Sequence, residues 1–140
     1  MASTGKVLQF LLLCLLVVLN TFETEAFKYQ KVKVGTPYEI ECYHSSALGL
    51  TPTGLELWWY HNGKMSRVAS LKHGMATAEG PLAHAAKVSG FQLASSVFLN
   101  LRVEKASAEE MGPFVCMFNY RDKNKSEKSA VADYVNFVPT

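Results

Sequence analysis

The sequence predicts an all-β protein folded as a sandwich of two sheets. Short segments in which apolar and polar residues alternate recur along residues 31–138, and turn-forming residues separate them. Alternation with a period of two marks strands that bury one face, and a series of such strands favours a sandwich. Two cysteines also lie far apart in this region, as expected for one long-range disulfide in a secreted domain.

The first of these segments, residues 31–42, reads KVKVGTPYEIEC. Its residues Tyr38, Ile40 and Cys42 alternate with glutamates, which predicts a strand with one buried face. An Asn62-Gly63 pair follows another such segment directly and predicts a tight hairpin turn. Similar patterns predict strands at residues 55–60, 97–103, 112–118 and 130–138.

The parity of these strands selects candidate core residues. In residues 55–60, LELWWY, the two leucines and Trp59 share one side of the strand. Trp59 is therefore predicted to be buried and Trp58 to face outward. By the same argument, Leu101 and Phe114 are predicted to lie in the core.

Residues 1–26 have the organisation of a secretory signal peptide. One positive charge, Lys6, precedes an apolar run at residues 7–19, and small residues ending at Ala26 follow. The run has 13 residues, whereas a membrane span needs about 20, so an uncleaved anchor is the less favoured alternative. The C-terminal DYVNFVPT lacks the apolar tail of a lipid-anchor signal. We expect residues 27–140 to form one secreted, extracellular domain without a membrane span.

The cysteines allow one intramolecular disulfide in such a domain. Cys14 would leave with the signal peptide, so that Cys42 and Cys116 remain in an oxidising compartment. The bond would close a loop of about 75 residues and contribute roughly 4 kcal/mol on the chain-entropy model. Two free thiols are the disfavoured alternative.

The order Cys42, Trp59, Cys116 resembles the immunoglobulin superfamily. The motifs VKVGTPYEIEC, WYHNGK and LNLRV followed by EMGPFVC resemble strands of that family in the right order, over nearly all of residues 30–138. The resemblance implies a Greek-key sandwich with one cysteine on each sheet and the tryptophan packed on the disulfide. It is similar to the variable-like or intermediate sets of the family.

Two positions qualify this resemblance. The family places a tyrosine two residues before the second cysteine, where this chain has Phe114, which lacks the hydroxyl of the tyrosine corner. Lys87 and Glu110 stand where the family has an ion pair at the end of the sandwich. The alternative is that both are unpaired surface charges.

Several function classes lack support in the sequence. The net charge is only +2 and the lysines are scattered, so no basic face for nucleic acid is predicted. The chain has no glycine-rich phosphate loop and no nucleophile elbow. We therefore expect neither an enzyme nor a bound cofactor. No metal site is expected, because the histidines lack ligand partners at suitable spacing; they are His44, His61, His73 and His84.

The outward parity of two strands predicts a binding surface. The resemblance makes residues 55–60 and 112–118 neighbouring strands, C and F, in one sheet. Their outward apolar residues should form one exposed patch, which Tyr134 on strand G joins if Val135 and Phe137 point inward. That parity stays open, because Asp133 is on their side of the strand unless a bulge intervenes. The alternative is that residues 65–90 fold over this face. The predicted binding residues are Trp58, Tyr60, Val115, Met117 and Tyr134.

These observations predict a secreted recognition module that binds a cell-surface or matrix protein through its C–F–G sheet, or a second copy of itself. The resemblance to small secreted single-domain members implies roles in adhesion, receptor clustering or synaptic organisation. The alternative is a soluble immune factor or decoy for a cytokine or microbial ligand. Asn124 begins an Asn-Lys-Ser sequon in a charged loop and is the predicted glycosylation site.

Overall fold

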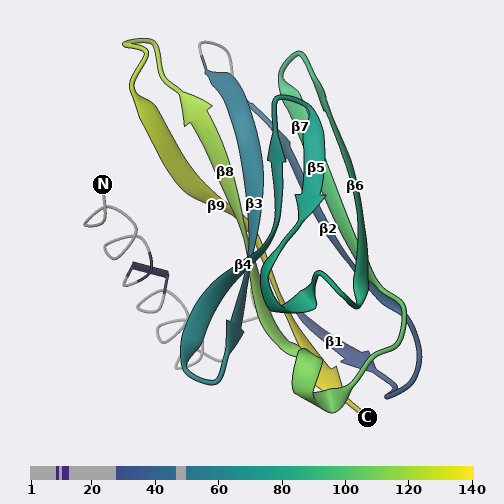
Figure 1. The fold of residues 1–140 in the computed structure, drawn as a ribbon. Helices are drawn as coiled ribbons and strands as arrows, with labels where there is room; N and C mark the ends of the chain where they lie inside the picture. The colour runs from purple at the N-terminus through teal and green to yellow at the C-terminus, as the bar shows by residue number, and fades with distance from the viewer. Residues whose placement is uncertain (1–8, 10, 13–27, 47–49) are drawn as a thin grey trace.

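The computed structural model describes residues 9, 11–12, 28–46 and 50–140, and in these residues it contains nine strands and two one-turn 3-10 helices. The predicted signal-peptide cleavage after Ala26 lies outside the described residues. Residues 9, 11 and 12 are helical. The rest of the described chain forms two sheets packed face to face, which confirms the predicted all-β sandwich (Figure 1).

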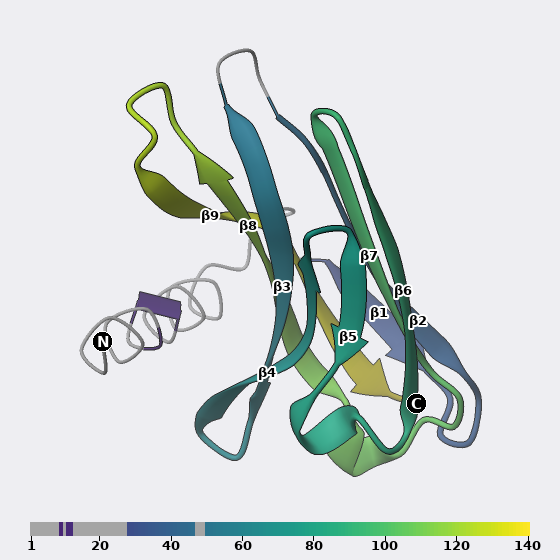
Figure 2. The same ribbon diagram turned by 45° about the horizontal axis from the view of Figure 1, so that its top comes forward.

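The larger sheet has six strands in the order β1-β9-β8-β3-β4-β5, and the smaller has three in the order β2-β7-β6. The strands β1 and β9 pair in parallel, whereas all other neighbours are antiparallel. Figure 2 shows the two layers from a second direction. The six strands of the larger sheet are β1 (Tyr29–Val32), β3 (Thr51–His61), β4 (Lys64–Lys72), β5 (Met75–Ala78), β8 (Gly112–Arg121) and β9 (Glu127–Pro139). The smaller sheet consists of β2 (Tyr38–Ser45), β6 (Ala86–Leu93) and β7 (Ser96–Val103), and the 3-10 helices are η1 (Gly80–Leu82) and η2 (Ala108–Glu110).

Residues 31–42 are divided between the two sheets, with the predicted strand through Tyr38, Ile40 and Cys42 in β2. A turn separates β1 from β2, with Gly35 at a φ of 91° and its amide hydrogen-bonded to the Ala106 carbonyl at 2.7 Å. Pro37 follows in the same turn and donates no backbone hydrogen bond. The chain therefore crosses from one sheet to the other at this point, which the alternation of residues 31–42 did not indicate.

The core lies between the sheets and contains the disulfide. Cys42 on β2 is bonded to Cys116 on β8, with 5.9 Å between their Cα atoms, so the bond links the two sheets as expected. Trp59 is 2% exposed in the same cluster, and its indole Nε1 donates to the Met111 carbonyl at 3.3 Å. Leu101 and Phe114 are completely buried there.

A bulge in β9 determines which residues of the last strand face the core. Cys116 pairs with Asp133 and Met117 with Val131, so Ala132 is an extra residue on β9. Beyond the bulge, Phe137 is 2% exposed and packs into the core.

The end of the sandwich near η2 differs from the predicted ion pair. Lys87 Nζ lies 3.7 Å from Glu104 Oε1, so the predicted pairing of Lys87 with Glu110 is wrong; Glu104 lies near β6 just after β7 ends. The Tyr38 hydroxyl donates to the Glu110 carbonyl at 2.8 Å. This bond ties β2 to η2 by a tyrosine hydroxyl that Phe114 cannot supply. Burial, and then the Glu110 carboxylate, raise the pKa of Tyr38 far above its ordinary value.

Candidate interaction surface

The strands β3, β8 and β9 bring the predicted binding residues together on the outer side of the six-stranded sheet. Trp58 lies opposite Val115, which lies opposite Tyr134 on the next strand. On the other flank, Tyr60 pairs with Met65 of β4. We call this set the apolar face; it consists of Trp58, Tyr60, Met65, Val115, Met117 and Tyr134.

The apolar face is covered in the structure. The expectation of an exposed patch is therefore wrong for the full chain, which includes Leu12. Val115 is fully buried, Met117 is 4% exposed and Tyr134 is 8% exposed. Leu12, in a helical turn of the N-terminal segment, packs in the same cluster and is 2% exposed. Burying apolar side chains against each other removes both surfaces from water, which accounts for this contact.

Residues 65–90 do not fold over the apolar face, apart from Met65. Most of β4 and all of β5 extend the six-stranded sheet sideways, and β6 belongs to the other sheet. Trp58 and Tyr60 remain half-buried at the margin. The indole Nε1 of Trp58 is enclosed and has no hydrogen-bond acceptor among the described residues.

A partly buried ionic network borders the apolar face on the same side of the sheet. The Glu56 carboxylate accepts hydrogen bonds from Arg67 at 2.7 Å and from the Asn119 amide at 3.1 Å. Arg67 also lies 2.6 Å from Glu79, and Ser129 donates to Asn119 at 2.7 Å. The hydrogen bond with Glu56 raises the pKa of Arg67.

The sequence reasoning missed this network. Glu56 shares the outward parity of Trp58 in residues 55–60, which predicts an exposed side chain, yet only 8% of the residue is exposed. The sequence offered one signal: Glu56 stands between two leucines in a strand that the resemblance places inside a sheet. A carboxylate that becomes buried there needs a partner. The partner could not be identified, since Arg67 lies on the next strand.

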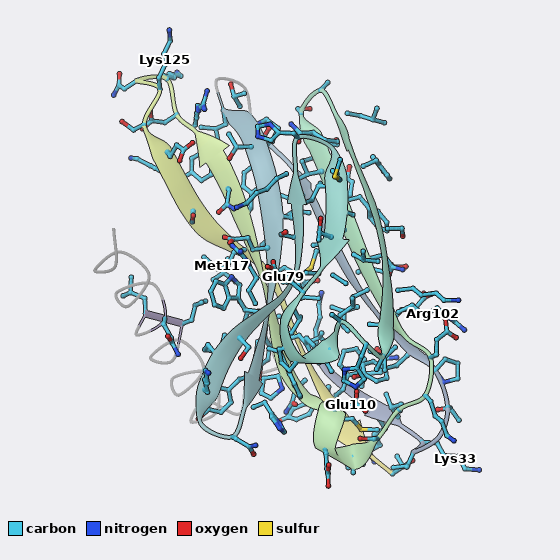
Figure 3. The ribbon with its side chains drawn as sticks, in the orientation of Figure 1. Lys33, Glu79, Arg102, Glu110, Met117 and Lys125 are labelled. Carbon is cyan, nitrogen blue, oxygen red and sulfur yellow. A yellow bond between two sulfur atoms is a disulfide. The ribbon has the colours of Figure 1, made fainter. Side chains whose placement is uncertain are left out.

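The loop between β8 and β9 projects from one end of the sandwich, with Lys125 at its tip (Figure 3). Asp122 orders it by accepting hydrogen bonds from the backbone amides of Asn124 at 2.9 Å and Ser126 at 3.0 Å. The pKa of Asp122 is lowered mainly by the hydrogen bond from the Ser126 amide and also by the nearby Lys128. Asn124 is exposed, as a glycosylation site requires.

No group of three or more histidine, cysteine or carboxylate side chains in the described part of the chain could hold a metal ion. His61 stacks on Trp59 with 4.2 Å between ring centroids, and His44 lies 3.9 Å from Phe118. Within the same residues, no helix is long and apolar enough to cross a membrane.

Two sheets packed face to face, joined by Cys42 and Cys116 with Trp59 in the core, define an immunoglobulin-like domain. No family model and no curated protein matches the sequence. Among solved structures, that of murine CRIg is similar, with a TM-score of 0.64 and 9% sequence identity. The match covers 81% of this chain and 92% of that chain. At this identity the likeness shows the fold alone.

Proposed function

We propose that this chain is a secreted recognition module that binds an extracellular or cell-surface protein through the apolar face. The observation that carries the proposal is that six apolar or aromatic residues cluster on the outer side of a sheet whose inner side already has a full core. Large apolar clusters outside the core of a small domain are characteristic of interaction sites.

Removal of the signal peptide would uncover the apolar face. Leu12 lies within residues 1–26, the predicted signal peptide, so a processed chain would lose the side chain that packs against Val115 and Met117. The exposed surface would combine aromatic residues with methionines, the composition enriched in protein interfaces. The Glu56–Arg67 pair at its border would provide a polar rim.

The strand order supports assignment to the variable-like set. Strands β4 and β5 extend the larger sheet beyond β3, which is the addition that distinguishes variable-type from constant-type domains. Small secreted domains of this kind fit a role in adhesion or receptor clustering, with the apolar face as the contact surface.

The processing step is tested by N-terminal sequencing of the protein secreted from animal cells. A mature chain that begins at Phe27 is expected. Retention of residues 7–19 in the secreted protein would leave the apolar face covered and contradict the proposal.

The binding step is tested with the double variant Trp58→Arg, Met117→Glu. We expect its melting curve to stay close to that of the wild type and its capture of cell-surface proteins by cross-linking to be lost. The matched control is Val34→Arg, Met75→Glu, which changes two exposed apolar residues away from the apolar face. Equal capture by the double variant and the control would exclude the apolar face as the site.

A further inference from the structure

The outer side of the three-stranded sheet carries a row of aromatic side chains. In the strand register, Tyr43 of β2 lies opposite Phe98 of β7, which lies opposite Phe91 of β6. We call these three residues the aromatic row. Tyr43 is 56% exposed and Phe91 is 43% exposed, and the rings of Phe91 and Phe98 stack with 5.3 Å between centroids. Leu93, one row further along β6, is 65% exposed.

The core does not account for the aromatic row. Along all three strands, alternate residues point inward and fill the core, whereas the aromatic row belongs to the outward set. The aromatic row and the apolar face also lie on opposite outer sides of the sandwich. Figure 3 shows this separation, with Met117 and Arg102 projecting on opposite sides.

The charges on the same surface are arranged asymmetrically across the strands. One row contains Glu39 on β2, Arg102 on β7 and Lys87 on β6. Arg102 is paired within the chain, 3.1 Å from Glu39 and 3.4 Å from Glu104. The side chain of Lys87 is 80% exposed and forms an exposed ion pair with Glu104 at 3.7 Å. The surface therefore carries the carboxylates Glu39 and Glu41 along β2 and one lysine, Lys87, along β6, with the aromatic row crossing both strands.

We propose that this surface binds a second copy of the chain, with a two-fold axis that runs parallel to the strands over β7. Such an axis exchanges β2 of one copy with β6 of the other and keeps each row facing itself. Lys87 then faces the partner's Glu39, and Tyr43 faces the partner's Phe91, each contact occurring twice. Sheets packed face to face keep their strands within about 30° of each other, which suits this arrangement.

The size of the surface makes the dimer weak. Four rows of three outward side chains contribute on each copy, whereas a stable interface uses about 20–30 residues a side. The contact is therefore a concentration-dependent association, and it does not depend on the apolar face.

Sedimentation of the secreted protein over a range of concentrations tests the aromatic row. We expect a reversible dimer that persists in the Trp58→Arg, Met117→Glu variant, which separates this association from the proposed function. Phe91→Ser should weaken dimerisation by about tenfold or more, as loss of an aromatic anchor at an interface does. Met75→Ser, at an exposed apolar residue elsewhere, should leave it unchanged. A protein that stays monomeric at the highest concentration, or a dimer indifferent to Phe91→Ser, would overturn the proposal.

The orientation of the two copies is tested by exchanging charges. Lys87→Glu and Glu39→Lys should each weaken the homodimer, because like charges then face each other twice. Mixed together, the two variants should form a heterodimer in which both facing pairs are again opposite in charge. Native mass spectrometry of the mixture measures this. If homodimers and heterodimers form in statistical proportion, the arrangement is wrong.

Discussion

Trp58 and Trp59 are adjacent in the sequence but have different environments. Trp59 is 2% exposed among core residues, whereas Trp58 is half-buried on the outer side of the sheet. Trp59→Ala should lower the free energy of unfolding by about 3–5 kcal/mol, because it leaves a cavity in the core. Trp58→Ala should cost about 1 kcal/mol, as a partly exposed position does. Urea unfolding of both variants checks this, and the reverse order would mean that the register of β3 is shifted by one residue.

Arg67 holds two carboxylates on the outer side of the sheet. Arg67→Met should destabilise the protein by about 2–4 kcal/mol, because Glu56 would stay buried beside Asn119 without a cation. In the double variant Glu56→Gln, Arg67→Met most of the loss should be recovered, since the buried charge is gone. A double-mutant cycle of unfolding free energies measures the coupling. Additive losses would show that Glu56 and Arg67 do not depend on each other.

At the level of the strands, the approach of β3 to β4 depends on a glycine. A Cβ at Gly54 would collide with the backbone carbonyl oxygen of Leu71, which cannot rotate away. Gly54→Ala should therefore cost at least about 3 kcal/mol, at the upper end of overpacking effects. Gly74→Ala is the control, because its Cβ meets open space and only its positive φ costs about 1 kcal/mol. Thermal unfolding that ranks Gly74→Ala as the worse variant would contradict the close strand contact.

Alternation along the strands predicted much of this fold because it reflects a property of one strand at a time. It placed Trp59 and Trp58 on opposite sides of β3, and it placed Phe114 and Val115 on opposite sides of β8. It also left open the bulge at Ala132, which the structure contains. The alternation alone did not indicate the division of residues 31–42 between β1 and β2, because the division depends on a turn at Gly35.

Features that depend on distant partners could not be predicted from the same pattern. The contact of Leu12 with the apolar face joins segments about a hundred residues apart. Lys87 pairs with Glu104 because the chain leaves β7 next to β6. The aromatic row forms only because the register of three strands brings its residues side by side. Alternation indicates which residues of β2, β6 and β7 face outward in each strand, but it does not show that they form one surface.

For the molecule as a whole, the disulfide is the longest-range covalent constraint. Cys42 and Cys116 are 74 residues apart in the sequence, and both are buried. Cys42→Ser should remove roughly 4 kcal/mol by the loop-entropy estimate and reduce secretion sharply. Secreted yield and melting temperature are the measurements, with Cys14→Ser, in the predicted signal peptide, as the control. An unchanged melting temperature would mean that the cross-link does not stabilise the sandwich.

The outer strands of both sheets bear on how copies of the protein meet. In the larger sheet these are β1 and β5, only four residues each, and in the smaller sheet β2 carries Glu39 and Glu41 and β6 carries Lys87. Short or charged outermost strands are poor templates for adding another chain by backbone hydrogen bonds. Fibre growth is thereby disfavoured even at high concentration, and encounters between copies are directed to the flat sides of the sheets, where side chains set the specificity.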